Sequence, residues 1–316
     1  MAAKETCSGP AFPCEREPNQ AAIVALDERD LVAALALSAS ARWNQNEADW
    51  RMLLTLGQGW GIRSTAADGR ERLAASTVVL PYGGAFAWVS MVLVLPEFQR
   101  RGYARRLLRH ALDTLAARSV RGLLDATPEG HSVYVHEGFH DAWGFARYRR
   151  ERSAARAHAP ADTPLGRVHS SAHSGTRLLR DSDWPAIEAL DTPTFGASRV
   201  PLLRALAQRL PQAARVAEAE GRLRGFVFGR DGRDASQIGP LVAETDAIAI
   251  GLIDDALRAV AGVICIDLLD RRRTLLPWLQ QQGFVFQRPF TRMAHGAPGA
   301  PGDCDSIVLV AGPELG

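Results

Sequence analysis

Residues 89–112 read VSMVLVLPEFQRRGYARRLLRHAL and combine three local signals in one run. The residues up to Leu95 are almost all apolar, as in a buried strand, and Pro96 interrupts them. Residues 104–115 then place apolar side chains three and four positions apart, which is typical of one face of a helix. Between these two segments lies a turn that contains Gly102. The run therefore predicts a strand, a glycine turn and an amphipathic helix.

The turn QRRGYA, residues 99–104, carries the features of an anion site. Its backbone N–H groups point outward at the positive end of the following helix. Gly102 has no Cβ, so the backbone there can approach an anion closely. Four guanidinium groups surround this end, from Arg100, Arg101, Arg105 and Arg106. The turn predicts a phosphate or pyrophosphate site, and the alternative is a strand–turn–helix with a solvated arginine face.

Two motifs give this segment a family resemblance. QRRGYA resembles the acetyl-CoA signature of the GNAT superfamily of N-acetyltransferases, Q/R-x-x-G-x-G/A, which follows a V-x-P strand end. Gln99, Gly102 and Ala104 occupy the motif positions, and Val94-Leu95-Pro96 matches the strand end. YVHEGF, residues 134–139, resembles the family's later Y-x-x-x-G-F motif. The two motifs occur in the family's order, and the resemblance covers roughly residues 21–150.

The resemblance implies an α/β (α+β) fold, in which a mixed, mostly antiparallel sheet is flanked by helices and splays after its fourth strand. It also implies acetyl-CoA as the acetyl donor. The pantetheine arm is expected to pair with the backbone of the fourth strand, and the QRRGYA amides are expected to hold the pyrophosphate. The cofactor-binding residues implied in this way are Val92, Leu93, Val94, Gln99, Arg100, Arg101, Gly102, Tyr103, Ala104 and Arg105.

The same resemblance assigns chemistry to two side chains. Tyr134 stands where the family's general acid stands, and a phenol can give its proton to a departing thiolate. The alternative is a packing tyrosine before Gly138-Phe139. Asp125 ends the next strand and is expected to position or deprotonate the amine, although it is equally a turn aspartate before Thr127-Pro128. No cysteine lies near either motif, which favours direct attack by the amine over a thioester intermediate.

Acceptor contacts are expected from the first helices, their connection and the one polar residue of the fourth strand. The candidate substrate residues are Trp43, Asn44, Glu47, Trp50 and Ser90. Two tryptophans beside a glutamate can hold a cationic amine, but tryptophans at such positions also serve helix packing. No metal site is predicted, because His136 and His140 have no evident third ligand.

Residues 222–286 echo residues 72–139, so a second GNAT-like domain is predicted. GPLVAETDAIAIGLIDDAL parallels the run around the phosphate turn, but it is three residues shorter there. Glu244 and Asp246 replace basic residues, and Leu279 stands where Tyr134 stands in the first copy. The second copy is therefore predicted to have lost both cofactor turn and acid. Its expected role is to close the substrate gap or to mediate association.

Composition sets the remaining limits. The chain has 316 residues, is 47% hydrophobic and 23% charged, and carries a net charge of +2, so neither a nucleic-acid nor a membrane partner is expected. Its four cysteines are too few for a disulfide scaffold and predict a cytoplasmic protein. We expect a tail over residues 1–20, a catalytic domain over 21–150, a linker over 151–175 and the degenerate domain over 176–316.

The function predicted from the sequence is transfer of an acetyl group from acetyl-CoA to a primary amine, most simply that of a small molecule. Two alternatives stay open. One is a non-catalytic sensor that binds acyl-CoA, and the other is an acetyltransferase that modifies proteins. The sequence leaves the acceptor, the acyl length and the oligomeric state open.

Overall fold

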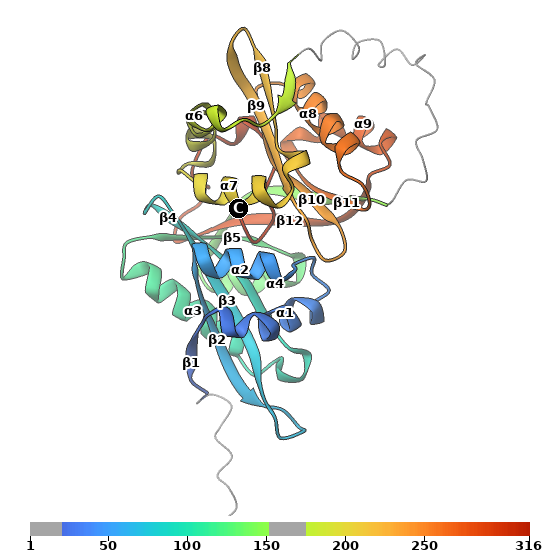
Figure 1. The fold of residues 1–316 in the computed structure, drawn as a ribbon. Helices are drawn as coiled ribbons and strands as arrows, with labels where there is room; N and C mark the ends of the chain where they lie inside the picture. The colour runs from blue at the N-terminus through green and yellow to red at the C-terminus, as the bar shows by residue number, and fades with distance from the viewer. Residues whose placement is uncertain (1–20, 152–174) are drawn as a thin grey trace, which may run out of the picture.

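The computed structural model describes residues 21–151 and 175–316, and Figure 1 shows the arrangement of its elements. The predicted tail and nearly all of the predicted linker lie outside the described residues. The elements of the first half follow in chain order: β1 (Ile23–Leu26), α1 (Leu31–Ser40), α2 (Glu47–Leu56), β2 (Gln58–Thr65), β3 (Glu71–Tyr82), β4 (Phe86–Val94), α3 (Tyr103–Ala116), β5 (Arg121–Ala126), α4 (Pro128–His136) and β6 (Phe139–Arg150).

The second half repeats this plan of strands and helices. Its elements are β7 (Thr176–Leu178), α6 (Trp184–Phe195), α7 (Val200–Arg209), β8 (Arg215–Ala219), β9 (Arg222–Arg230), β10 (Ser236–Ala243), α8 (Asp246–Ala259), β11 (Ile264–Leu269), α9 (Leu276–Gln281), β12 (Val285–His295) and β13 (Ile307–Leu309). The mixed, mostly antiparallel sheet with flanking helices that the sequence predicts is thereby confirmed.

The strands form one continuous sheet in which the two halves interleave. The order is β1-β2-β3-β4-β5-β12-β6-β11-β13-β10-β9-β8-β7. Strand β12 of the second half lies between β5 and β6 of the first, and it pairs antiparallel with both. Strand β6 in turn pairs with β11. The pairs β4–β5 and β10–β11 are parallel. The boundary predicted near residue 150 stays a prediction, because the sheet runs across it without a break.

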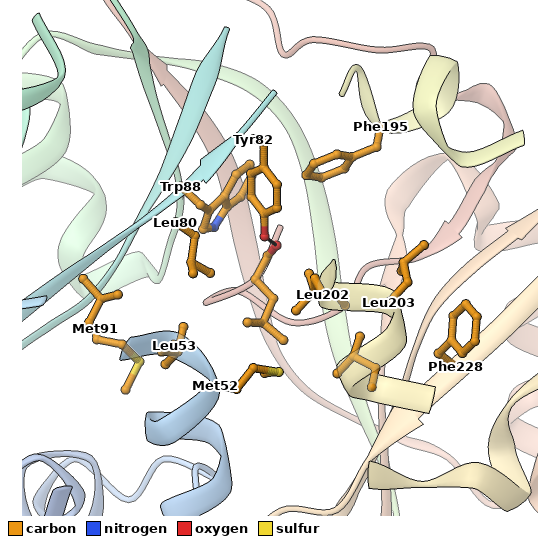
Figure 2. Packing of buried hydrophobic residues seen from close by; sticks show 14 of the residues in the cluster. Met52, Leu53, Leu80, Tyr82, Trp88, Met91, Phe195, Leu202, Leu203 and Phe228 are labelled. Carbon is orange, nitrogen blue, oxygen red and sulfur yellow. Dashed lines mark hydrogen bonds between the residues drawn. The ribbon is translucent and has the colours of Figure 1, made fainter. Parts of the chain in front are cut away.

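An apolar cluster joins the halves where α2 faces α7 (Figure 1). Figure 2 shows Met52 and Leu53 of α2 on one side, Leu202 and Leu203 of α7 on the other, and aromatic side chains of β3 and β4 above them. The Tyr82 hydroxyl donates to the Leu315 carbonyl oxygen at 2.6 Å, which ties the last residues into this cluster. Burial of each such side chain contributes roughly 1.5–3 kcal/mol, so the halves share one core.

Buried ion pairs cross the same boundary. Asp49 caps α2 together with Asn46 and also accepts a hydrogen bond from Arg230 at 2.7 Å. Arg230 donates as well to Glu314, whose carboxylate accepts from the amide of Gln45 at 2.8 Å. All four of the side chains that form this network, those of Gln45, Asp49, Arg230 and Glu314, are buried. The network fixes the position of the segment after β13 against the start of α2.

Most of the local structure expected from the sequence is present. Asp27 caps the turn that leads into α1, and Asn46 caps α2, two positions for which the residue type in the sequence predicts a helix cap. The strands on either side of the Pro81–Gly84 turn and the helix after Gly102 are also confirmed. The helix expected around residues 132–137 begins earlier, at Pro128, because proline suits the first turn of a helix. The long strand β12 was not predicted.

Candidate active site

A groove opens between the end of β4 and α4, past the point where the parallel pairing of β4 with β5 stops. The register of these two strands ends at Trp88 and Leu123. Beyond that point Met91 has a φ of +51°, and the pairing of β4 with β3 shifts, as at a β-bulge. The groove has a volume of about 700 Å³. Nine of the ten predicted cofactor residues line it: Val92, Leu93, Val94, Gln99, Arg100, Gly102, Tyr103, Ala104 and Arg105.

The far end of the groove is the start of α3. Gly102 has a φ of +78° and occupies the position before the first helical residue, where no side chain caps the helix amides. A Cβ built on Gly102 would meet no atom within 4 Å, so the space in front of these amides is open. Uncapped N–H groups at a helix N-terminus attract an anion. This end of the groove therefore has the geometry of a phosphate site.

The four arginines of the turn do not all face the groove. Arg100 and Arg105 line it, and Arg105 is ion-paired with Glu137 on the opposite wall. Arg101 turns back and donates a hydrogen bond to a backbone carbonyl oxygen of the preceding turn at 3.1 Å. Arg106 lines a neighbouring depression on the other side of α3. Four guanidinium groups were expected around the anion, and two of them are in a position to contact an anion bound in the groove.

At its inner end the groove meets a small cavity, and Val92 belongs to the walls of both. The cavity has a volume of about 50 Å³, which is room for only a few atoms. Both halves contribute to its walls. Ser90, Asp125 and Tyr134 come from the first half, and Arg288, Phe290 and Glu314 come from the second. The structure thus brings the predicted acid and the predicted amine-binding carboxylate into one cavity.

Tyr134 reaches the cavity from α4. Its ring packs edge-on against Phe139, with 5.9 Å between the ring centres. Among the described residues the hydroxyl has no hydrogen-bond partner, and burial raises its pKa to about 12. The phenol is therefore protonated at any pH at which an enzyme works. It is a proton donor without a partner at the wall of the cavity.

Asp125 lies at the end of β5, where its side chain is fully buried and bound to Arg292. The two residues face each other directly in the β5–β12 ladder, and both hydrogen bonds measure 2.9 Å. Arg292 is itself held between the indole rings of Trp88 and Trp143, at 4.3 and 4.0 Å from the ring centres. Burial outweighs the pairing and raises the pKa of Asp125 to about 6.

The five predicted substrate residues separate into two groups. Trp43, Asn44 and Ser90 line the cavity, and within the described part of the chain the buried Ser90 hydroxyl has no hydrogen-bond partner. Glu47 lies outside it on the surface, in an ion pair with the next turn of α2. Trp50 is fully buried, and its indole N–H donates to a serine of α1 at 3.1 Å. Trp50 therefore packs helices together, which is the alternative left open for it.

Sequence reasoning missed the residues that the second half contributes. These are Arg288 and Phe290 from β12 and Pro313 and Glu314 from the segment after β13; Gln45 and Arg147 of the first half were missed as well. The four residues of the second half are far away in the sequence from the predicted ones, and neither they nor Gln45 and Arg147 belong to a motif. The available signal was the second copy itself, which predicted a wall for the substrate gap but not the residues in it.

In the second half, the chain itself fills the corresponding gap. Strands β10 and β11 pair in parallel only at their starts, from Ser236 to Ile238 on β10. Strand β13 enters where they diverge, and Leu309 lies opposite both Leu241 and Leu268. In the first half, the end of β4 beyond its pairing with β5 lines the groove instead. Within the described residues, the second half therefore has no free strand edge at this position with which a pantetheine arm could pair.

The two acidic residues that replace basic ones in the second copy are already paired with arginines. Glu244 accepts from Arg224 at 2.7 Å, and Asp246 accepts from Arg272 at 3.0 Å. Thr245 caps α8 through its hydroxyl, whereas α3 begins at an uncapped glycine. The second half therefore differs from the first because β13 fills its gap and a side chain caps its helix, and not because of its charge.

Comparison with known proteins agrees with this geometry. Residues 12–145 match the model of the acetyltransferase (GNAT) family, and residues 187–308 match an acetyltransferase (GNAT) domain model. The chain is 24% identical over 263 residues to the uncharacterized N-acetyltransferase YitH of Bacillus subtilis (strain 168), covering 83% of this chain and 87% of that protein. These matches identify the chain as a transferase enzyme. It belongs to the GNAT family and carries two GNAT domains in tandem.

Solved structures share the whole architecture. A Pyrococcus horikoshii protein superposes with a TM-score of 0.72 and 18% identity, over 99% of this chain and 100% of that chain. A tandem GNAT protein from the clavulanic acid biosynthesis pathway has a TM-score of 0.60 and 16% identity, over 87% and 98% of the two chains. In the part of the chain that the structure describes, no helix is long and apolar enough to cross a membrane.

Proposed function

We propose that this enzyme transfers the acetyl group of acetyl-CoA to the primary amine of a small molecule, by direct attack within a ternary complex. The observation that carries the proposal is the junction of the groove with the cavity at Val92. On one side of the junction lie a free strand edge and an uncapped helix N-terminus. On the other side lie a protonated phenol and a carboxylate.

The groove fits the donor in two respects. The edge of β4 over residues 92–94 faces the groove, and its amide and carbonyl groups are available to the amides of a pantetheine arm. The open space at Gly102 admits a pyrophosphate to the first-turn amides, with Arg100 at its side. Acetyl-CoA supplies an activated acetyl group as a thioester when it is bound.

Two side chains of the cavity divide the proton chemistry. Tyr134 holds the proton that a departing thiolate needs, because its raised pKa keeps the phenol neutral. Asp125 has a pKa of about 6, close to the pH at which a general base is most effective. Its oxygens face Arg292 and retain further lone pairs, so the carboxylate can accept a hydrogen bond from the amine.

A small acceptor is favoured over a polypeptide because the second half closes the cavity. Phe290 and Glu314 form part of its walls, and its volume of about 50 Å³ leaves no broad groove for a chain. A cytoplasmic location stays a prediction from the cysteine content.

One observation favours a second candidate, a sensor that binds acyl-CoA without turnover. Both carboxylates in the cavity walls are already paired with arginines, Asp125 with Arg292 and Glu314 with Arg230. If neither carboxylate accepts a proton from an amine, the groove binds a thioester that is not consumed.

The test combines a binding and a turnover measurement on the purified full chain. Calorimetry with acetyl-CoA measures occupation of the groove, and release of free thiol measures transfer to a panel of amines, amino acids and aminoglycosides. Binding together with amine-dependent thiol release supports the enzyme proposed. Binding without release from any amine favours the sensor, and absence of binding refutes both candidates.

A further inference from the structure

One side chain of the cavity has no role in the chemistry described above. Arg288 lies on β12, beside Arg147 of β6, and lines the cavity. It is half-buried, and its guanidinium lies over the ring of Phe290 at 4.9 Å from the ring centre. Among the described residues it makes no hydrogen bond and no ion pair. It is thus a cation that the fold holds in place but does not neutralise.

The neighbouring buried arginines differ from Arg288 in this respect. Arg147 is held by Asp267 through two hydrogen bonds of 2.8 and 2.7 Å. Arg292 is held by Asp125 in the same bidentate way, and Arg230 is paired with two carboxylates. Burial and the nearby charge of Arg147 lower the pKa of Arg288 more than the carboxylates of Asp267, Glu129 and Glu314 raise it, which means that its charge is less favourable here than in water. An anion beside it would relieve that cost.

The donor does not supply this anion. The phosphate site lies at Gly102, at the far end of the groove, whereas Arg288 belongs to the cavity. The part of a donor that reaches the cavity, a thioester and its acetyl group, is uncharged. Any anion beside Arg288 therefore comes from the acceptor.

We propose that the acceptor is an amino acid or a similarly compact amine that carries a carboxylate, and that Arg288 binds this carboxylate. This inference rests on the proposed function. The planar fork of a guanidinium matches the two oxygens of a carboxylate, and its stacking on Phe290 holds the fork in one plane. The cavity's volume of about 50 Å³ limits the body of the acceptor to a few atoms unless the walls move. The Ser90 hydroxyl also lines the cavity, has no hydrogen-bond partner among the described residues, and is available to the amine.

The experiment compares acceptors that differ only in the carboxylate. Glycine, β-alanine and γ-aminobutyrate are paired with methylamine, ethylamine and propylamine, and each is tested with the wild type, Arg288→Met and Arg288→Lys. The matched control is Arg271→Met, because Arg271 is an exposed arginine outside the cavity. We expect the wild type to prefer at least one amino acid over its amine by about 10–100-fold in kcat/KM, as expected for a charged hydrogen-bonded pair.

In Arg288→Met that preference should disappear, mainly through a higher KM for the acceptor, while the affinity for acetyl-CoA and the activity of Arg271→Met stay unchanged. Arg288→Lys should restore part of it, since lysine keeps the charge but loses the fork. Equal rates with and without the carboxylate, or an unchanged preference in Arg288→Met, would overturn the inference. Thermal-shift titration of the same compounds separates it from the proposed function. A rise in melting temperature that requires the carboxylate and that Arg288→Met abolishes supports the Arg288 site. If this rise is seen but no acceptor is acetylated, only the proposed function is refuted.

Discussion

Replacement of Tyr134 by phenylalanine removes one hydroxyl from the candidate active site and changes almost nothing else. The ring keeps its edge-on contact with Phe139, and among the described residues the hydroxyl has no hydrogen bond to lose. We therefore expect the free energy of unfolding to change by less than about 1 kcal/mol. Loss of a general acid lowers kcat by roughly 10²–10⁴-fold, or about 3–5 kcal/mol in activation free energy.

The measurement is thiol release under saturating acetyl-CoA, with thermal unfolding as the control for stability. Tyr148→Phe is the matched variant, because Tyr148 packs against Phe286 outside the cavity and should leave kcat unchanged. The KM for acetyl-CoA should barely move in Tyr134→Phe, since the phenol does not line the groove. Burial raises the pKa of Tyr134 to about 12, so the wild-type rate should show no loss of this acid between pH 6 and about pH 10. Wild-type turnover in Tyr134→Phe, with chemistry shown to limit the rate, would refute the acid role and leave Tyr134 a packing residue.

Four further outcomes follow from the same geometry. Gly102→Glu should abolish acetyl-CoA binding in calorimetry while the fold persists, because it places bulk and negative charge before open amides; retained affinity would contradict the phosphate site. If Asp125 acts as the base, kcat/KM rises with pH through about 6, where the carboxylate ionises, and Asp125→Asn removes that rise; a profile flat through pH 6 would contradict this role. Arg292→Met leaves the buried Asp125 carboxylate unpaired and should cost about 3–5 kcal/mol of stability, measured by urea unfolding; a change below about 1 kcal/mol would show that the pair is not needed. Titration should give one acetyl-CoA per chain, because β13 occupies the second gap, and a stoichiometry of two would disprove that argument.

Short-range features of the first half were predictable from the sequence, because each depends on neighbours in the chain. The cap at Asn46, the turn before β4 and the left-handed Gly102 are of this kind. The role of Trp50 was not predictable, because a tryptophan near a glutamate gives the same sequence pattern whether its indole contacts a ligand or another helix. The same limit applies to Asp125. Its partner Arg292 is 167 positions away, and only the register of β12 against β5 places them together.

The interleaved sheet explains how the second half, whose own gap is filled by β13, still contributes walls to the candidate active site. Strand β12 fills the place between β5 and β6, so the first half lacks a central strand on its own. The same strand brings Arg292 to Asp125 and Arg288 to the cavity, because alternate residues of a strand point to the same face. A change in the turn before α8 would leave these contacts of β12 in place, whereas loss of β12 would remove a core strand, an ion pair and a cavity wall together. The second half is therefore constrained at places that contact the first half, among them β12, α7 and the segment after β13.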